Sequence, residues 1–118
     1  MPGVSSAIGV PELSPVDLRY RLLHDHPPPL VVDVREPREF KQGHIPQAEL
    51  VPLPKLLTAA PTLPHDRVII LVCRTGRRSV RAAAALQHHG YHRLRILRGG
   101  ILAWEAAGLL EAVSGELE

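Results

Sequence analysis

Residues 68–79 have the sequence VIILVCRTGRRS, and this stretch decides the fold. Val68 to Val72 is an uninterrupted apolar run rich in β-branched residues, which predicts a strand buried on both faces. The polar residues from Cys73 to Arg78 include Gly76 and predict a loop. A helix is expected over 79–89, and its apolar face would carry Val80, Ala83, Ala84 and Leu86.

Strands and helices alternate along the rest of the chain. Other strands are expected over 10–13, 30–34, 50–53 and 93–97. Other helices are expected from Ser14 to the prolines 27–29 and over 37–42, 55–60 and 101–107. This alternation predicts an α/β fold with a five-stranded, mainly parallel sheet and helices on both faces.

The first helix has clear start and stop signals. Ser14 can cap it, Pro15 suits the first helical position, and Asp17 stands at the spacing of a capping box. The prolines at 27–29 end the helix. Pro11 would confine the strand over 10–13 to a sheet edge, because proline has no N–H to donate.

Size and composition predict one domain. The chain has 118 residues, of which 45% are hydrophobic and 22% charged, enough to bury a core. We expect an N-terminal extension over 1–9, a domain over 10–110 and a tail over 111–118. The net charge of +2 and the four aromatic residues argue against nucleic acid as the main partner.

Targeting signals and residue usage bear on the protein's environment. Met1 to Ser14 contains no basic stretch followed by an apolar run, and no segment could span a membrane, so we expect a cytoplasmic protein with no membrane partner. Twelve of the 14 basic residues are arginine, prolines number 12 and asparagine is absent. A thermophilic source or a GC-rich genome would each produce this usage.

The single cysteine, Cys73, lies where a parallel sheet binds ligands. Such sheets bind ligands beyond the carboxyl ends of their strands, here after 30–34 and after 68–72. The loop amides and the following helix N-terminus can converge on the sulfur and favour a thiolate. An isolated cysteine is commonly a buried inert thiol, but its place in a Gly- and Arg-bearing loop favours a reactive one. One cysteine excludes an internal disulfide and a multi-cysteine metal site.

Four arginines follow Cys73 at the predicted helix start, where the helix dipole disfavours cations. An anionic ligand would turn this penalty into attraction. The alternative is that they are exposed and screened by solvent. These residues are Arg74, Arg77, Arg78 and Arg81.

Four motifs together resemble the rhodanese homology domain, in its order and at its spacing. They are VVDVREP at 31–37, GHIP at 43–46, CRTGRRS at 73–79 and GGILAW at 99–104. The resemblance spans roughly residues 10–110 and implies a rhodanese-like fold with sulfurtransferase activity and no cofactor or metal. The donor implied is a small sulfur anion such as thiosulfate, and the acceptor is a thiol, cyanide or a protein.

The resemblance also implies roles for individual residues. Cys73 would be the nucleophile that carries a persulfide. Asp33 would orient the Cys73 loop or an arginine, or serve as a helix cap or structural salt bridge. Arg35 would hold architecture or help to bind anions. The donor would be bound by the rest of the loop, which comprises Arg74, Thr75, Gly76, Arg77 and Arg78.

This chain departs from the family pattern at a few positions, and two other residues of the motifs have a structural interpretation. Gln47 and Leu50 replace a usual glycine and asparagine, and Thr75 stands where some thiosulfate-specific members have a cation. His44 is expected to make a structural hydrogen bond. Trp104 is expected to pack in the core or to wall the pocket.

Three other functions are weaker alternatives. A phosphatase or arsenate reductase of this fold needs arginine six residues after the cysteine, where this chain has Ser79. A noncatalytic or regulatory module could relay sulfur through a protein partner. Metal binding by His88, His89 and His92 is disfavoured because Gly90 interrupts the helix and no carboxylate completes the set.

Overall fold

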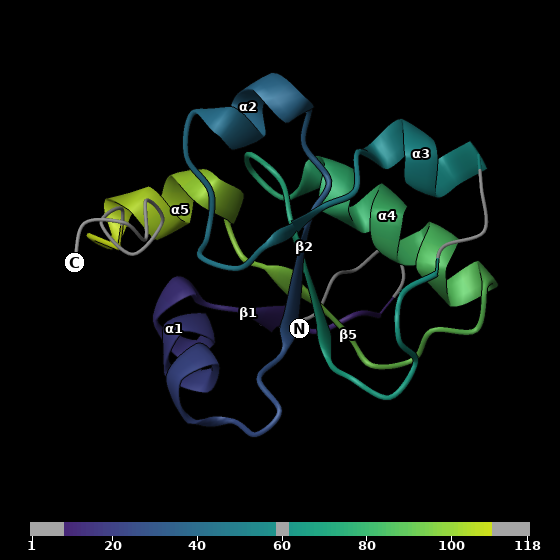
Figure 1. Ribbon diagram of the computed structural model, residues 1–118, viewed down its shortest axis with the longest axis horizontal. Coiled ribbons are helices and arrows are strands. Elements are labelled where there is room, and N and C mark those ends of the chain that lie inside the picture. The colour runs from purple at the N-terminus through teal and green to yellow at the C-terminus, as the bar shows by residue number, and fades with distance from the viewer. Residues whose placement is uncertain (1–8, 59–61, 110–118) are drawn as a thin grey trace.

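The computed structural model describes residues 9–58 and 62–109 (Figure 1). Strands and helices alternate along the described residues. The strands are β1 (Glu12–Leu13), β2 (Leu30–Asp33), β3 (Glu49–Leu50), β4 (Ile69–Val72) and β5 (Leu94–Leu97). The helices are α1 (Pro15–His24), α2 (Pro37–Lys41), α3 (Leu53–Thr58), α4 (Arg77–His88) and α5 (Gly100–Ala106).

The five strands form one sheet in the order β1-β5-β4-β2-β3, and every neighbouring pair is parallel. The predicted five-stranded sheet is therefore confirmed. The central strand β4 is buried at all four positions, as its apolar run predicted. The two edge strands, β1 and β3, have two residues each, and Pro11 immediately precedes β1.

Helices cover both faces of the sheet, with α1 and α5 on one side and α3 and α4 on the other (Figure 1). Successive residues of β4 divide between the two layers, because side chains of a strand alternate between its faces. Ile70 and Val72 pack with Trp104 of α5, whereas Ile69 and Leu71 pack with Leu86 of α4. The core thus consists of two apolar layers separated by the sheet.

The predicted Ser14 cap and the stop of α1 before the prolines are confirmed. Ser14 is the N-cap, and its hydroxyl oxygen accepts a hydrogen bond from the Asp17 amide at 3.1 Å. The helix ends at His24, before the run of prolines at 27–29. Cap and prolines together set the length of the crossover that returns the chain to β2.

Several boundaries differ from the prediction: β1, for example, begins at Glu12 rather than at residue 10. Two of the differences have a clear local cause. Helix α4 begins at Arg77 rather than at residue 79, because Gly76 adopts a φ of 117° and turns the chain into the helix two residues early. Leu53 begins α3 instead of ending the strand predicted over 50–53; Pro54 follows it, and proline suits a helix's first turn. Ala60, the expected end of that helix, lies outside the described residues.

The apolar face of α4 also needs a correction. Ala84 was expected on this face, but it is exposed, whereas Ala82 is buried beside Ala83 and Leu86. Ala82 is buried because it lies four residues before the buried Leu86, and residues spaced by four lie on the same face of a helix. The earlier start of the helix does not change which residues share a face. The small residues let α4 lie close over the sheet.

The proposed chain ends fall largely beyond what the structure describes. Residues 1–8 of the expected extension and the tail over 111–118 lie outside the described residues. Among the helices that the structure does describe, none combines the length and apolar character needed to cross a membrane.

Candidate active site

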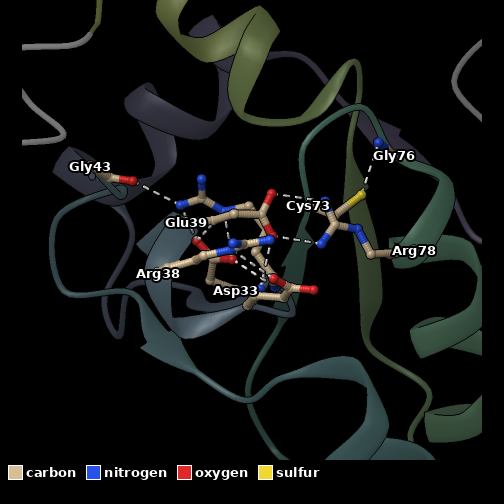
Figure 2. A network of polar contacts seen from close by, with 9 residues as sticks. Asp33, Arg38, Glu39, Gly43, Cys73, Gly76 and Arg78 are labelled. Atoms are coloured by element: carbon tan, nitrogen blue, oxygen red, sulfur yellow. Dashed lines mark hydrogen bonds and ion pairs between the residues drawn. The ribbon is translucent and has the colours of Figure 1, made fainter. Parts of the chain in front are cut away.

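Cys73 directly follows the central strand β4, at the carboxyl end of the sheet. The residue is 1% exposed and packs with the apolar layer on the α3 and α4 side. Its sulfur nevertheless has a polar neighbour, because the Gly76 amide donates a hydrogen bond to Sγ at 2.9 Å (Figure 2). The sulfur therefore faces a backbone dipole that favours negative charge, and it is not surrounded by hydrocarbon alone.

The loop that holds the sulfur is shorter than predicted. It comprises residues 73–76, called the Cys73 loop below, whereas the sequence predicted a loop extending to Arg78. Arg77 and Arg78 instead form the first turn of α4. The backbone N–H groups of a first helical turn have no partner within the helix, so those of α4 are available near the end of the Cys73 loop.

Helix α5 holds the Cys73 loop from the other side. The Ile101 amide donates to the Cys73 carbonyl oxygen at 2.8 Å, and the Leu102 amide donates to the Arg74 carbonyl oxygen at 3.2 Å. In a trans peptide the N–H points opposite to the C=O. The N–H groups of Arg74 and Thr75 therefore point away from α5, and no acceptor for them exists among residues 9–58 and 62–109.

Asp33 and Arg35 form a salt bridge beside the Cys73 loop. Asp33 is in register with Val72, so its carboxylate lies at the end of the strand next to β4. The Arg35 guanidinium donates to this carboxylate at 2.9 Å from Nε and 2.8 Å from Nη2. The same Nη2 donates to the Gly43 carbonyl oxygen at 2.8 Å.

Both members of the Asp33–Arg35 salt bridge are buried inside the protein. Asp33 is 1% exposed and Arg35 is 5% exposed, and the Arg35 amide also donates to Asp33 Oδ1 at 3.0 Å. Of the expected alternatives, the geometry therefore places Asp33 against an arginine, in a salt bridge that joins the end of β2 to the turn at Gly43. Arg35 has its guanidinium engaged inside the protein.

Arg78 makes the second ion pair of the site, with Glu39 of α2. Its Nη1 donates to Glu39 Oε1 at 2.8 Å and its Nη2 donates to Oε2 at 3.1 Å (Figure 2). The hydrogen bonds from Arg78 lower the pKa of Glu39 to about 2, against an opposing effect of burial. The same pairing raises the pKa of Arg78, and Cys73 contributes to this increase.

Glu39 was not identified from the sequence. Its signal was the spacing Glu36-Pro37-Arg38-Glu39, which places an acidic residue in the first turn of a helix. The Glu36 amide does donate to Glu39 Oε1 at 2.9 Å. Helix signals, however, do not reveal that this carboxylate also reaches an arginine 39 residues further along the chain.

The remaining arginines and Thr75 lie on the surface. Arg74 and Thr75 of the loop and Arg77 and Arg81 of α4 are exposed. None of these three arginines forms an ion pair with any residue that the structure describes. The predicted cluster is thus divided: Arg78 is paired with Glu39, and the other three arginines are exposed with no ion pair to a described residue.

The two motif residues outside the site have structural contacts. His44 Nδ1 lies 2.8 Å from the Phe40 carbonyl oxygen, and its ring stacks on the Phe40 ring at 3.7 Å. Trp104 is 1% exposed, and its indole N–H donates to the Leu109 carbonyl oxygen at 2.9 Å. Both residues pack; neither is within hydrogen-bonding distance of Cys73.

The candidate metal residues lie at the far end of α4. His88 is the last helical residue, His89 is the C-cap, and Gly90 follows with a φ of 87°. All three histidines, His92 included, are exposed. Within the described ranges, no three side chains of the metal-binding types come together.

Comparison with known proteins identifies the family to which this fold and site belong. The chain matches the rhodanese-like domain family over residues 16–107 and belongs to that family. A rhodanese-related protein from Thermoplasma volcanium has a similar crystal structure, with a TM-score of 0.73 at 28% identity. The match covers 82% of this chain and 92% of that one.

Two of the curated relatives are named as sulfurtransferases. A sulfurtransferase from Allochromatium vinosum is 44% identical over 80 residues, which cover 68% of this chain and 75% of that protein. The thiosulfate sulfurtransferase GlpE from Pseudoalteromonas translucida is 33% identical over 78 residues, or 66% of this chain and 74% of its own length. These similarities support the assignment of this chain as a sulfurtransferase.

Proposed function

We propose that this protein moves a sulfane sulfur from thiosulfate or a related persulfide donor to a thiophilic acceptor, and that Cys73 carries the sulfur as a persulfide. The observation that carries the proposal is the Gly76 amide at 2.9 Å from Cys73 Sγ, at the carboxyl end of the central strand. This position combines a nucleophile with dipoles that stabilise negative sulfur. Membership of a family with sulfurtransferase relatives supports the same conclusion.

The transfer balances without an added oxidant or reductant. The Cys73 thiolate attacks the outer sulfur of thiosulfate, a new S–S bond forms, and the S–S bond of the donor breaks. Sulfite leaves with the electron pair of that bond, and Cys73 holds S–S⁻. A thiolate or cyanide then attacks the terminal sulfur and restores the Cys73 thiolate. The enzyme thus follows a double displacement.

The rest of the Cys73 loop supplies the binding groups in this proposal. The N–H groups of Arg74 and Thr75, which have no acceptor among the described residues, can form hydrogen bonds to thiosulfate or to the sulfur that Cys73 has gained. Arg74 and Arg77 are the exposed cations nearest in sequence to the sulfur, and they attract the anion. Asp33 and Arg35 support the site from the neighbouring strand through their buried pair.

Intact mass measurement tests the intermediate directly. Incubation with thiosulfate, without an acceptor, is expected to add one sulfur atom, about 32 Da, to the wild-type chain. Cyanide should remove it and yield thiocyanate. The Cys73→Ser variant keeps the shape of the side chain and should show neither the mass gain nor turnover. Turnover by this variant would exclude Cys73 as the nucleophile.

A second candidate function is sulfur relay from one protein to another with slow use of thiosulfate. The ion pair between Arg78 and Glu39 favours it, because a neutralised arginine contributes less to binding a free dianion. Fast transfer from the Cys73 persulfide to a protein thiol, combined with negligible thiosulfate turnover, would identify this function. Fast turnover of thiosulfate together with fast transfer to a protein thiol would support the first proposal.

A further inference from the structure

Glu39 and Arg78 bridge two crossover segments at the edge of the Cys73 site. Helix α2 follows β2 and helix α4 follows β4, and these two strands are neighbours in the sheet. The two carboxylate oxygens of Glu39 each accept one hydrogen bond from Arg78, at 2.8 and 3.1 Å. This geometry fixes the guanidinium more firmly than a single contact would.

Glu39 is held in place independently of Arg78. The Glu36 amide donates to its Oε1 at 2.9 Å, within the first turn of α2. The side chains of Glu39 and Arg78 are only 24% and 32% exposed, so solvent screens their charges less than those of a fully exposed pair. A fixed negative charge therefore stands beside Arg78, on a different crossover helix.

The other arginines near Cys73 differ in this respect. Arg74 and Arg77 are exposed and have no acidic partner among the described residues, and both are therefore available to any anion. Arg78 is engaged before a donor arrives. A donor that needs this guanidinium must compete with a carboxylate that is already bound to it and must also approach the charge of that carboxylate.

We propose that Glu39 is a specificity-determining residue that weakens the capture of doubly charged sulfur donors and shifts the preference of Cys73 toward donors of lower charge. This inference rests on the proposed sulfurtransferase function. The repulsion between Glu39 and a donor scales with the donor's charge, so a dianion is penalised about twice as strongly as a monoanion at the same position. Discrimination follows from charge and needs no steric difference.

Two donors with the same reacting group can measure this effect. Thiosulfate is a dianion, and methanethiosulfonate is a monoanion in which a methyl group replaces one oxygen. In both reactions the Cys73 thiolate attacks the terminal sulfur and the donor S–S bond breaks. Sulfite leaves in the first case and methanesulfinate in the second, each with the bonding electron pair. The ratio of kcat/KM for the two donors reports charge preference.

The Glu39→Gln variant removes the charge and keeps an oxygen that can accept from Arg78. We expect its thiosulfate KM to fall at least about fivefold with kcat little changed, and its methanethiosulfonate KM to fall by a clearly smaller factor. Glu36→Gln is the comparison variant, because it removes the same charge from the N-cap residue of the same helix. Glu36 pairs with the exposed Arg38 at 3.1 Å and acts on Arg78 only through a weaker charge attraction, without a hydrogen bond. The donor ratio of Glu36→Gln should therefore change clearly less than that of Glu39→Gln.

The outcomes separate this inference from the proposed function. A higher thiosulfate KM in Glu39→Gln would show that Glu39 positions Arg78 for the donor, and it would overturn the inference. An unchanged donor ratio, or the same change in Glu36→Gln, would also overturn it. Wild-type protein that gains no sulfur from either donor would instead refute the proposed function. Circular dichroism and thermal unfolding confirm that the variants are folded.

Discussion

The Ile101 amide donates a hydrogen bond to the Cys73 carbonyl oxygen at 2.8 Å, and this contact joins the last helix to the residue that follows the central strand. Gly100, one residue earlier, makes the contact possible. Its φ is 63°, and a Cβ atom built on it would collide with the carbonyl oxygens of Cys73 and Arg74. The backbone of α5 therefore lies against the Cys73 loop with no room for a side chain.

Replacement of Gly100 by alanine should damage both stability and activity. Positive φ and collision with two backbone carbonyls together should lower the free energy of unfolding by at least about 3 kcal/mol. Relief of the collision would move the Cys73 loop, so kcat for sulfur transfer should fall as well. Urea unfolding and steady-state kinetics measure the two effects.

Gly108→Ala is the control for this substitution. Gly108 has a φ of 78°, but no atom of the described residues lies within 4 Å of the position of its Cβ. Alanine there should cost about 1 kcal/mol from backbone strain alone and leave kcat unchanged. Equal losses in the two variants would contradict the role assigned to the close contact of Gly100 with the loop.

Asp33→Asn should strongly destabilise the protein, because it leaves the buried Arg35 guanidinium without a counter-charge. Loss of one partner from a buried ion pair costs about 3–5 kcal/mol. The exposed pair of Glu12 and Arg98, at 3.3 Å, offers a comparison, and Glu12→Gln should cost at most about 1 kcal/mol. A loss of less than about 1 kcal/mol for Asp33→Asn in urea unfolding would contradict this account.

The ion pair of Glu39 with Arg78 should make stability depend on acid pH. The pKa of Glu39 is lowered from 4.5 to about 2 in the folded protein, so folding favours the charged carboxylate. Its contribution is complete above pH 4.5 and is lost as the pH falls toward about 2. The difference in unfolding free energy between wild type and Glu39→Gln should therefore shrink over this interval. A difference that stays constant down to pH 2 would show that the charge of Glu39 does not stabilise the fold.

The free cations of the Cys73 loop should act on donor binding. Arg74→Ala should raise the thiosulfate KM by about three- to tenfold with little change in kcat, and the effect should diminish at high ionic strength. Arg19, an exposed residue of α1, provides a control of equal charge, and Arg19→Ala should leave KM unchanged. Equal effects from both substitutions would mean that only net charge matters.

The architecture was accessible from the sequence because its signals are local. The apolar run of β4 and the Ser14 cap of α1 each specify an element through residues close in the chain. The start of α4 was placed two residues late because Arg77 and Arg78 resemble loop residues, and only the positive φ of Gly76 shows where the helix begins.

The candidate site was predictable only in part. The position of Cys73 followed from the rule that ligands bind at the carboxyl ends of parallel strands. The sequence did not predict which of the nearby arginines is ion-paired. The contact of Arg78 with Glu39 spans 39 residues and depends on how two crossover helices pack. Likewise, the close approach of Gly100 to the Cys73 loop depends on tertiary structure that no local motif encodes.

The short edge strands limit how this domain can associate with other chains. A long, flat edge offers a ladder of unpaired amides onto which a foreign β-segment can add. Here β1 and β3 each span two residues, and Pro11 removes a donor beside one of them. Strand addition and amyloid-type stacking on the described sheet therefore have little template.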